Sequence, residues 1–192
     1  MNILIVDDSK MNIKIAQDTL IEYCVPGDII GCLSGEEALE ILENDVVDLI
    51  LLDIIMPGIS GLDFLKIISG NGVLERVKVI MLTTVDDLQV LKQCFELGAT
   101  DYIRKPFDKL EFVVRVNSVI NEIENNKACN DALKQAADQI DELKRLHHSL
   151  NIMYHEALEL IGHSVDELIV DPTRDKIENL SAMIHRFAGY EK

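Results

Sequence analysis

The sequence predicts an α/β fold in which a five-stranded parallel sheet is covered by helices on both faces. Short apolar runs of strand length alternate with helical patterns along residues 1–107. Four of these runs end in polar residues, which is where parallel sheets build their sites. After Pro106 no strand pattern follows, and a helical pattern continues for roughly 50 residues without Gly or Pro.

Each predicted element follows from a local pattern. Strands are expected at 2–6, 28–32, 48–53, 77–82 and 100–104, and helices at 10–23, from 34, at 60–69 and at 86–97. Ser34 and Glu37 form a capping box that begins the second helix. Gly98 is expected to end the fourth helix. This element order indicates a flavodoxin-like, doubly wound sheet with strand order 2-1-3-4-5.

The long helix after Pro106 is predicted to form a coiled coil. Asp108 and Glu111 form its capping box, and apolar residues then recur at spacings of three and four. This spacing begins at Val119, although Glu122 interrupts it. The predicted dimer seam includes Asn126, Leu133, Ile140, Leu143, His147 and Leu150. A buried Asn in such a seam typically fixes two-stranded register, so we predict a parallel homodimer. A lone amphipathic helix folded back on its own domain is the alternative.

The chain is therefore expected to have three parts. Residues 1–122 form the α/β domain, 123–150 a coiled-coil linker and 151–192 a helical hairpin that serves as a dimerisation module. Gly162 is expected to loosen the long helix, and residues 171–173 are expected to end it.

Composition excludes several classes of protein. An apolar content of 48% excludes a disordered chain. The net charge of −16 argues against non-specific binding to DNA or to an anionic membrane, because both need a basic footprint. No apolar stretch approaches the ~20 residues of a membrane span, and the chain opens on a strand rather than a signal peptide. Four scattered cysteines without a Cys-x-x-Cys pair indicate reduced thiols, so a cytoplasmic protein is expected.

The polar residues at the strand ends form a chemically coherent set. Asp7, Asp8 and Asp53 supply carboxylates, Thr83 a hydroxyl and Lys105 an ammonium group. Three carboxylates close together repel one another and need a cation, and oxygen ligands suit Mg²⁺. The sequence therefore predicts a site for Mg²⁺ and a phosphoryl group.

These residues resemble the receiver domain of bacterial two-component response regulators. The residues that stand in the family's order are Asp7-Asp8, Asp53, Met56-Pro57-Gly58, Gly61, Thr83, Gly98-Ala99, Tyr102 and Lys105-Pro106-Phe107. The resemblance covers residues 1–122. It implies that a sensor histidine kinase or a phosphotransfer protein phosphorylates Asp53.

Beside that resemblance, physical reasoning gives each site residue a role. Asp8 and Asp53 would bind Mg²⁺ directly, Asp7 through water, and Ile55 through its backbone carbonyl. Asp53 would be the nucleophile. Lys105 and Mg²⁺ would neutralise the charge on the transferring oxygens.

Four residues complete the expected site. Thr83 would donate a hydrogen bond to the phosphoryl group, and Tyr102 would turn inward as Thr83 moves. Thr84 stands where the family usually has a small Ala, which leaves the entrance fairly open. The bond before Pro106 is expected to be cis, since X-Pro is the one place where cis is cheap.

The sequence fits two other phosphoryl-transfer functions less well. A phosphohydrolase with an Asp nucleophile would place Asp-x-Asp after the first strand, whereas Asp7 and Asp8 are adjacent. His155 and His185 lie in motifs that only partly resemble those of histidine kinases and phosphotransfer bundles. We therefore expect a signalling switch, not an enzyme. Alternatively, the chain is the front end of a longer regulator, or a relay intermediate or scaffold whose helical tail binds a separate effector.

Overall fold

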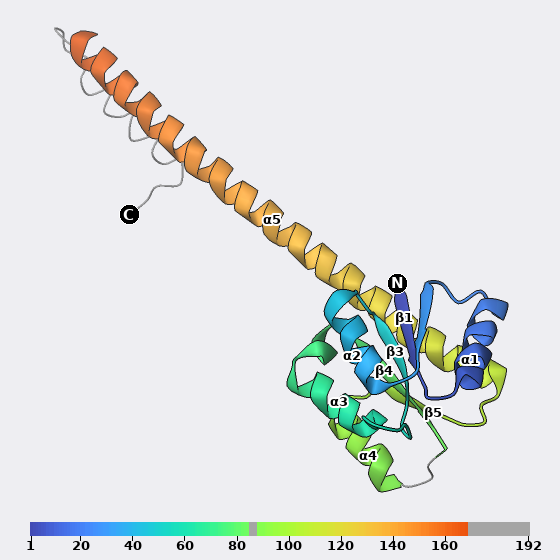
Figure 1. Cartoon of the computed structure of the whole chain (residues 1–192). Coiled ribbons are helices and arrows are strands. Elements are labelled where there is room, and N and C mark those ends of the chain that lie inside the picture. The colour runs from blue at the N-terminus through green and yellow to red at the C-terminus, as the bar shows by residue number, and fades with distance from the viewer. Residues whose placement is uncertain (85–87, 169–192) are drawn as a thin grey trace. The chain divides into compact units, whose positions relative to one another are not determined.

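The structure is a computed structural model that describes residues 1–84 and 88–168 (Figure 1). The chain divides into two compact units, an α/β domain (Met1–Asn130) and a helical tail that begins at Asp131. Helix α5 (Lys109–Leu168) contributes to both units. Val85 and the part of the predicted hairpin beyond residue 168, including His185, lie outside the described residues.

A parallel sheet of order β2-β1-β3-β4-β5 forms the centre of the α/β domain (Figure 1). Its strands are β1 (Asn2–Val6), β2 (Asp28–Cys32), β3 (Leu49–Asp53), β4 (Lys78–Thr83) and β5 (Asp101–Arg104). The order confirms the predicted flavodoxin-like fold class. Strand β4 reaches one residue further than predicted, so Thr83 ends the strand rather than following it.

The helices begin where the sequence offers capping side chains. They are α1 (Lys10–Glu22), α2 (Gly35–Asn44), α3 (Gly61–Gly70), the 3₁₀ turn η1 (Val73–Glu75), α4 (Leu88–Glu96) and α5. Ser9, Ser34 and Ser60 cap the first three helices, and each side chain accepts a hydrogen bond from a backbone N–H three residues on.

Strand residues alternate between two cores, one on each face of the sheet. Ile50 and Leu52 of β3 pack into the core formed with α2, α3 and α4. Leu49 and Leu51 pack into the core formed with α1 and α5. Because both faces are buried, β3 is apolar throughout until its last residue, Asp53, reaches the edge of the sheet.

Helix α5 packs on the sheet over more of its length than predicted. Val119 is buried in the α1–α5 core, so its predicted place in the dimer seam is wrong. Two ion pairs reach further along the helix. Glu122 contacts Lys78 at 2.6 Å, and Lys127 contacts Asp48 at 2.7 Å.

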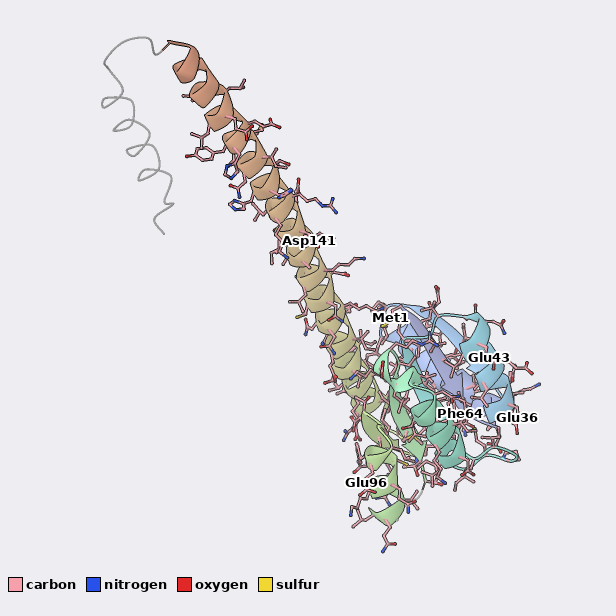
Figure 2. The ribbon with its side chains drawn as sticks, turned by 90° about the vertical axis from the view of Figure 1, so that its left-hand side faces the viewer. Met1, Glu36, Glu43, Phe64, Glu96 and Asp141 are labelled. Atoms are coloured by element: carbon pink, nitrogen blue, oxygen red, sulfur yellow. The ribbon has the colours of Figure 1, made fainter. Side chains whose placement is uncertain are left out.

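In the helical tail, most of the described side chains are exposed. Helix α5 runs through Gly162 as far as Leu168, so the loosening predicted at Gly162 is not observed. Side chains around Asp141 project from the helix (Figure 2). The predicted seam residues Asn126, Leu133, Ile140, Leu143, His147 and Leu150 are all exposed. Among the described residues, no helix combines the length and apolarity that a membrane span requires.

Candidate functional site

Three carboxylates meet at the carboxyl edge of the sheet. Asp7 follows β1 directly, Asp8 comes next, and Asp53 ends β3. Their ligand oxygens lie within 4.8 Å of one another. Asp7 is fully buried and Asp53 nearly so, whereas Asp8 is exposed. The site therefore has a buried floor and one carboxylate that faces solvent.

Lys105 partly compensates this negative charge. Its Nζ lies 2.5 Å from Asp7 Oδ2 and 2.8 Å from Asp53 Oδ2. The Lys105–Pro106 peptide bond is cis, the isomer that the sequence predicts. One ammonium group against three carboxylates leaves the cluster negative. Clustered carboxylate oxygens with residual negative charge fit a hard divalent cation such as Mg²⁺.

The environment of Asp53 shifts its titration. Burial raises the pKa of the Asp53 carboxyl above its ordinary value, and the Asp7 charge acts in the same direction. The hydrogen bond and the charge of Lys105 act against both. The pKa remains raised, so Asp53 keeps its proton to a higher pH than an exposed aspartate would.

The loop after β3 holds Asp53 in place. The Ile54 N–H donates to Leu82 O at 3.1 Å, and the Gly61 N–H donates to Ile54 O at 3.0 Å. A Cβ atom on Gly61 would lie only 2.0 Å from the Asp53 carbonyl oxygen, so this close approach requires glycine. The side chain of Ile55 is 59% exposed beside the site.

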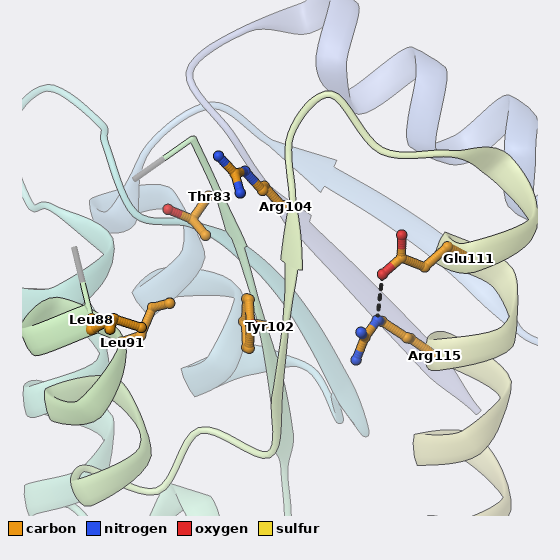
Figure 3. Close-up of a pocket in the computed structure, with 7 residues that line it drawn as sticks. All are labelled: Thr83, Leu88, Leu91, Tyr102, Arg104, Glu111 and Arg115. Atoms are coloured by element: carbon orange, nitrogen blue, oxygen red, sulfur yellow. Dashed lines mark hydrogen bonds and ion pairs between the residues drawn. The ribbon is translucent and has the colours of Figure 1, made fainter. Parts of the chain in front are cut away.

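A pocket of about 480 Å³ lies on the side of the sheet that β5 borders. It is lined by Thr83, Leu88, Leu91, Tyr102, Arg104, Glu111 and Arg115. Figure 3 shows Tyr102 with Leu91 of α4 on one side and Arg115 of α5 on the other. Thr83 is buried, Thr84 is exposed and Tyr102 is half-buried.

The structure thus brings Asp7, Asp8, Asp53 and Lys105 together, and places Thr83 on the strand next to Asp53. Asn12 was not among the predicted site residues, but its side-chain amide donates to Asp7 Oδ1 at 2.9 Å. Its position in the first turn of a helix that starts directly after the Asp pair was the available signal.

Comparisons with known proteins agree with this geometry. Residues 3–117, more than half of the chain, match the family model of the response regulator receiver domain. A Vibrio cholerae protein named "Probable cyclic di-GMP phosphodiesterase" is 37% identical over 139 residues, 72% of this chain and 30% of that protein. Response regulator PleD from Caulobacter vibrioides is 25% identical over 181 residues, 94% of this chain and 37% of PleD.

A solved receiver-domain structure is also similar to this chain. A CheY-like response regulator receiver domain protein from Methanospirillum hungatei superposes with a TM-score of 0.59 at 25% identity, and covers 65% of this chain and 97% of that one. The chain thus matches nearly all of that solved chain. It spans less than half the length of both curated relatives.

Proposed function

Because the chain belongs to the response regulator receiver family, we propose that it is a phosphorylation-controlled switch in which Asp53 is the phosphoacceptor. The observation that supports this most directly is the pairing of Asp53 with Lys105 at 2.8 Å beside the Asp7 and Asp8 carboxylates. A sensor histidine kinase or a phosphotransfer protein would be the donor. The chain itself would be a switch rather than an enzyme.

The chemistry is a transfer between a phosphohistidine and a carboxylate. An Asp53 oxygen forms a bond to phosphorus while the N–P bond of the donor breaks, and the histidine nitrogen leaves with its electron pair. The product is an acyl phosphate. Asp53 attacks as the carboxylate, so its proton must be lost before the transfer.

Lys105, together with a cation that the carboxylates would hold, would offset the negative charge on the transferring group. Asp8 and Asp53 would hold Mg²⁺ directly, Asp7 through water, and Ile55 through its backbone carbonyl. When bound, Mg²⁺ supplies electrostatic stabilisation of the phosphoryl oxygens. Lys105 already contacts Asp53, and can follow the charge onto the phosphoryl group without a large movement.

Phosphorylation would be reported through Thr83 and Tyr102. The Thr83 hydroxyl would donate a hydrogen bond to a phosphoryl oxygen, and Tyr102 would turn into the space that the Thr83 movement opens. The 480 Å³ pocket that Thr83, Leu91 and Tyr102 share offers room for that turn. The exposed side chain of Thr84 would leave the entrance to the site open. The outcome would be a change on the face formed by α4, β5 and α5.

The output would be a parallel homodimer through the exposed stripe of α5. That helix is 60 residues long, against a typical length of ~11 in globular proteins. Isolated helices are marginal in water, and most of their stability in proteins comes from packing an apolar face. A second copy of the same helix supplies that packing, with Asn126 and His147 at polar seam positions that fix the register.

A second candidate is supported by the length of the relatives. The chain matches only 30% of the Vibrio cholerae protein, which is named for phosphodiesterase activity. On this reading the chain is the front end of a longer regulator, or its tail binds a separate effector. The full length of the gene and the identity of its neighbours would separate this candidate from the first.

The proposal is tested by phosphorylation with acetyl phosphate and Mg²⁺, followed by intact mass spectrometry. The wild type is expected to gain one phosphoryl group, and Asp53→Asn to gain none. Asp45→Asn, a change at the end of α2, serves as the matched control and is expected to be phosphorylated normally. Phosphate on a histidine of the Asp53→Asn variant would contradict the assignment and point to His155 or His185.

A further inference from the structure

Asn12 lies beside the acidic site and contacts one of its carboxylates. Its Nδ2 is 2.9 Å from Asp7 Oδ1 and 3.2 Å from Oδ2. The Ser9 N–H donates to Oδ1 at 2.9 Å, and Lys105 Nζ donates to Oδ2 at 2.5 Å. Because the Asp7 side chain is fully buried, these three residues determine its orientation.

The three contacts are not equivalent. Ser9 contributes a backbone N–H that the start of α1 fixes in place. Lys105 is shared, since it also contacts Asp53. Asn12 is the neutral side chain of the set, so it orients Asp7 without cancelling the negative charge that a cation needs. A lysine or arginine at this position would neutralise Asp7 and compete with the cation.

We propose that Asn12 is a positioning residue for the Mg²⁺ site, and that its amide holds the Asp7 carboxylate in the orientation in which it serves the cation. The inference rests on the proposed function. Without the amide, Asp7 is free to turn further toward Lys105, and that contact must be rearranged when a cation binds. Residues that orient metal ligands in this way typically change metal affinity by about 10–100-fold when they are removed.

The test is titration calorimetry of the full chain with Mg²⁺ alone. Asn12→Leu removes the donor at nearly constant size and is expected to weaken Mg²⁺ binding about tenfold. Asn12→Gln keeps an amide and is expected to restore part of the affinity. Asn44→Leu is the matched control, because the Asn44 amide donates to the Glu40 carbonyl on α2, away from the carboxylates. It is expected to bind as the wild type does.

A second readout separates positioning from a general loss of activity. With acetyl phosphate as donor, the half-saturating Mg²⁺ concentration of Asn12→Leu should rise about tenfold. The rate at saturating Mg²⁺ should stay close to that of the wild type, because the hydrogen bonds that the Asn12 amide donates to described residues go to Asp7 and not to Asp53. Asn12→Ala repeats the test with a residue that suits a helix, in case the leucine variant does not fold.

Two outcomes would overturn the inference, and they have different consequences for the proposed function. If a folded Asn12→Leu or Asn12→Ala binds Mg²⁺ as tightly as the wild type, Asn12 does not position Asp7 and the proposed function is unaffected. If the wild type itself binds no Mg²⁺, the metal site of the proposed function fails, and the inference fails with it.

Discussion

The two halves of α5 contain similar apolar stripes but bury them to different extents. In the packed half (residues 109–127), Val116 and Ile120 are at most 2% exposed. In the exposed half (residues 131–161), Leu133, Leu143 and Leu150 are between 60% and 65% exposed. The packed half is stabilised by the sheet of its own chain. The exposed half has its stripe available for a partner, which is the basis for the proposed dimer.

This difference shows what a heptad pattern can and cannot establish. The spacing of three and four continues from Val119 to Leu150, yet Val119 packs inside the α/β domain. Periodicity predicts that a face will be buried, but not which surface covers it. The covering surface has to be identified from the rest of the fold.

The largest expected effect comes from truncating one apolar side chain in each half. Phe112 is fully buried and stacks on Phe107 with ring centroids 4.4 Å apart. Phe112→Ala should lower the free energy of unfolding of the α/β domain by about 3–5 kcal/mol. Leu143→Ala should leave that value unchanged. Urea unfolding followed by near-ultraviolet circular dichroism measures both, and equal losses would contradict the division of α5.

The lifetime of the phosphorylated state should depend on the α/β domain alone. Hydrolysis needs an oriented water, and Ile55 and Val85, which stand two residues after Asp53 and Thr83 in the sequence, have side chains without a hydrogen-bonding group. We expect slow dephosphorylation, and expect Ile55→Asn with Val85→Glu to accelerate it about 10- to 100-fold. Truncation after Asn130 should not change the rate.

The measurement is a time course of decay at fixed Mg²⁺ for all three proteins. Decay of the wild type within seconds would show that the two apolar side chains do not slow hydrolysis. A changed lifetime in the truncated chain would show that the exposed half of α5 influences the site.

A smaller effect is expected from the ion pair at the end of the packed half. Burial raises the pKa of Asp48, but the hydrogen bond and charge of Lys127 and the hydrogen bond from the Asn2 N–H outweigh it, so the pKa is lowered overall. Because the pKa of this carboxyl is lower in the folded state, its interactions stabilise the fold at pH values above the unfolded-state pKa of about 3.9. This stabilisation is lost as the pH falls through the folded-state pKa.

Lys127→Met should therefore lower the stability of the α/β domain at pH 7 by about 1 kcal/mol, a small value because the lysine is 57% exposed. The deficit relative to wild type should shrink as the pH is taken below about 4. Thermal unfolding across this pH range is the check, with Lys134→Met in the exposed half as the matched control. A deficit that is independent of pH would rule out the ion pair as its cause.

Much of the α/β domain could be predicted because its signals are local. Serine caps mark the starts of three helices, and four of the five strands end at or directly before a polar residue. The contact between Lys127 and Asp48 could not be predicted, because it joins residues 79 positions apart that only the folded sheet brings together. Asn12 was missed for a similar reason, since a helical Asn has many possible partners and only the geometry selects Asp7.

The central claim is that the stripe of α5 changes from intramolecular to intermolecular packing beyond Lys127. Cys129 lies just past that point and is exposed. It stands three residues after Asn126 and four before Leu133, so it falls in the predicted seam, and a parallel dimer would place its two copies opposite each other. The most direct measurement is cross-linking with a short bis-maleimide in a Cys24→Ser background, which removes the other exposed thiol.

We predict a covalent dimer through Cys129 in this experiment. Cross-linking should be abolished by Ile140→Asp with Leu143→Asp, which places charge in the seam. It should persist with Gln135→Asp and Ser149→Asp, which add the same charge outside the seam. A chain that is monomeric in light scattering at micromolar concentration and gives no Cys129 cross-link would contradict the account.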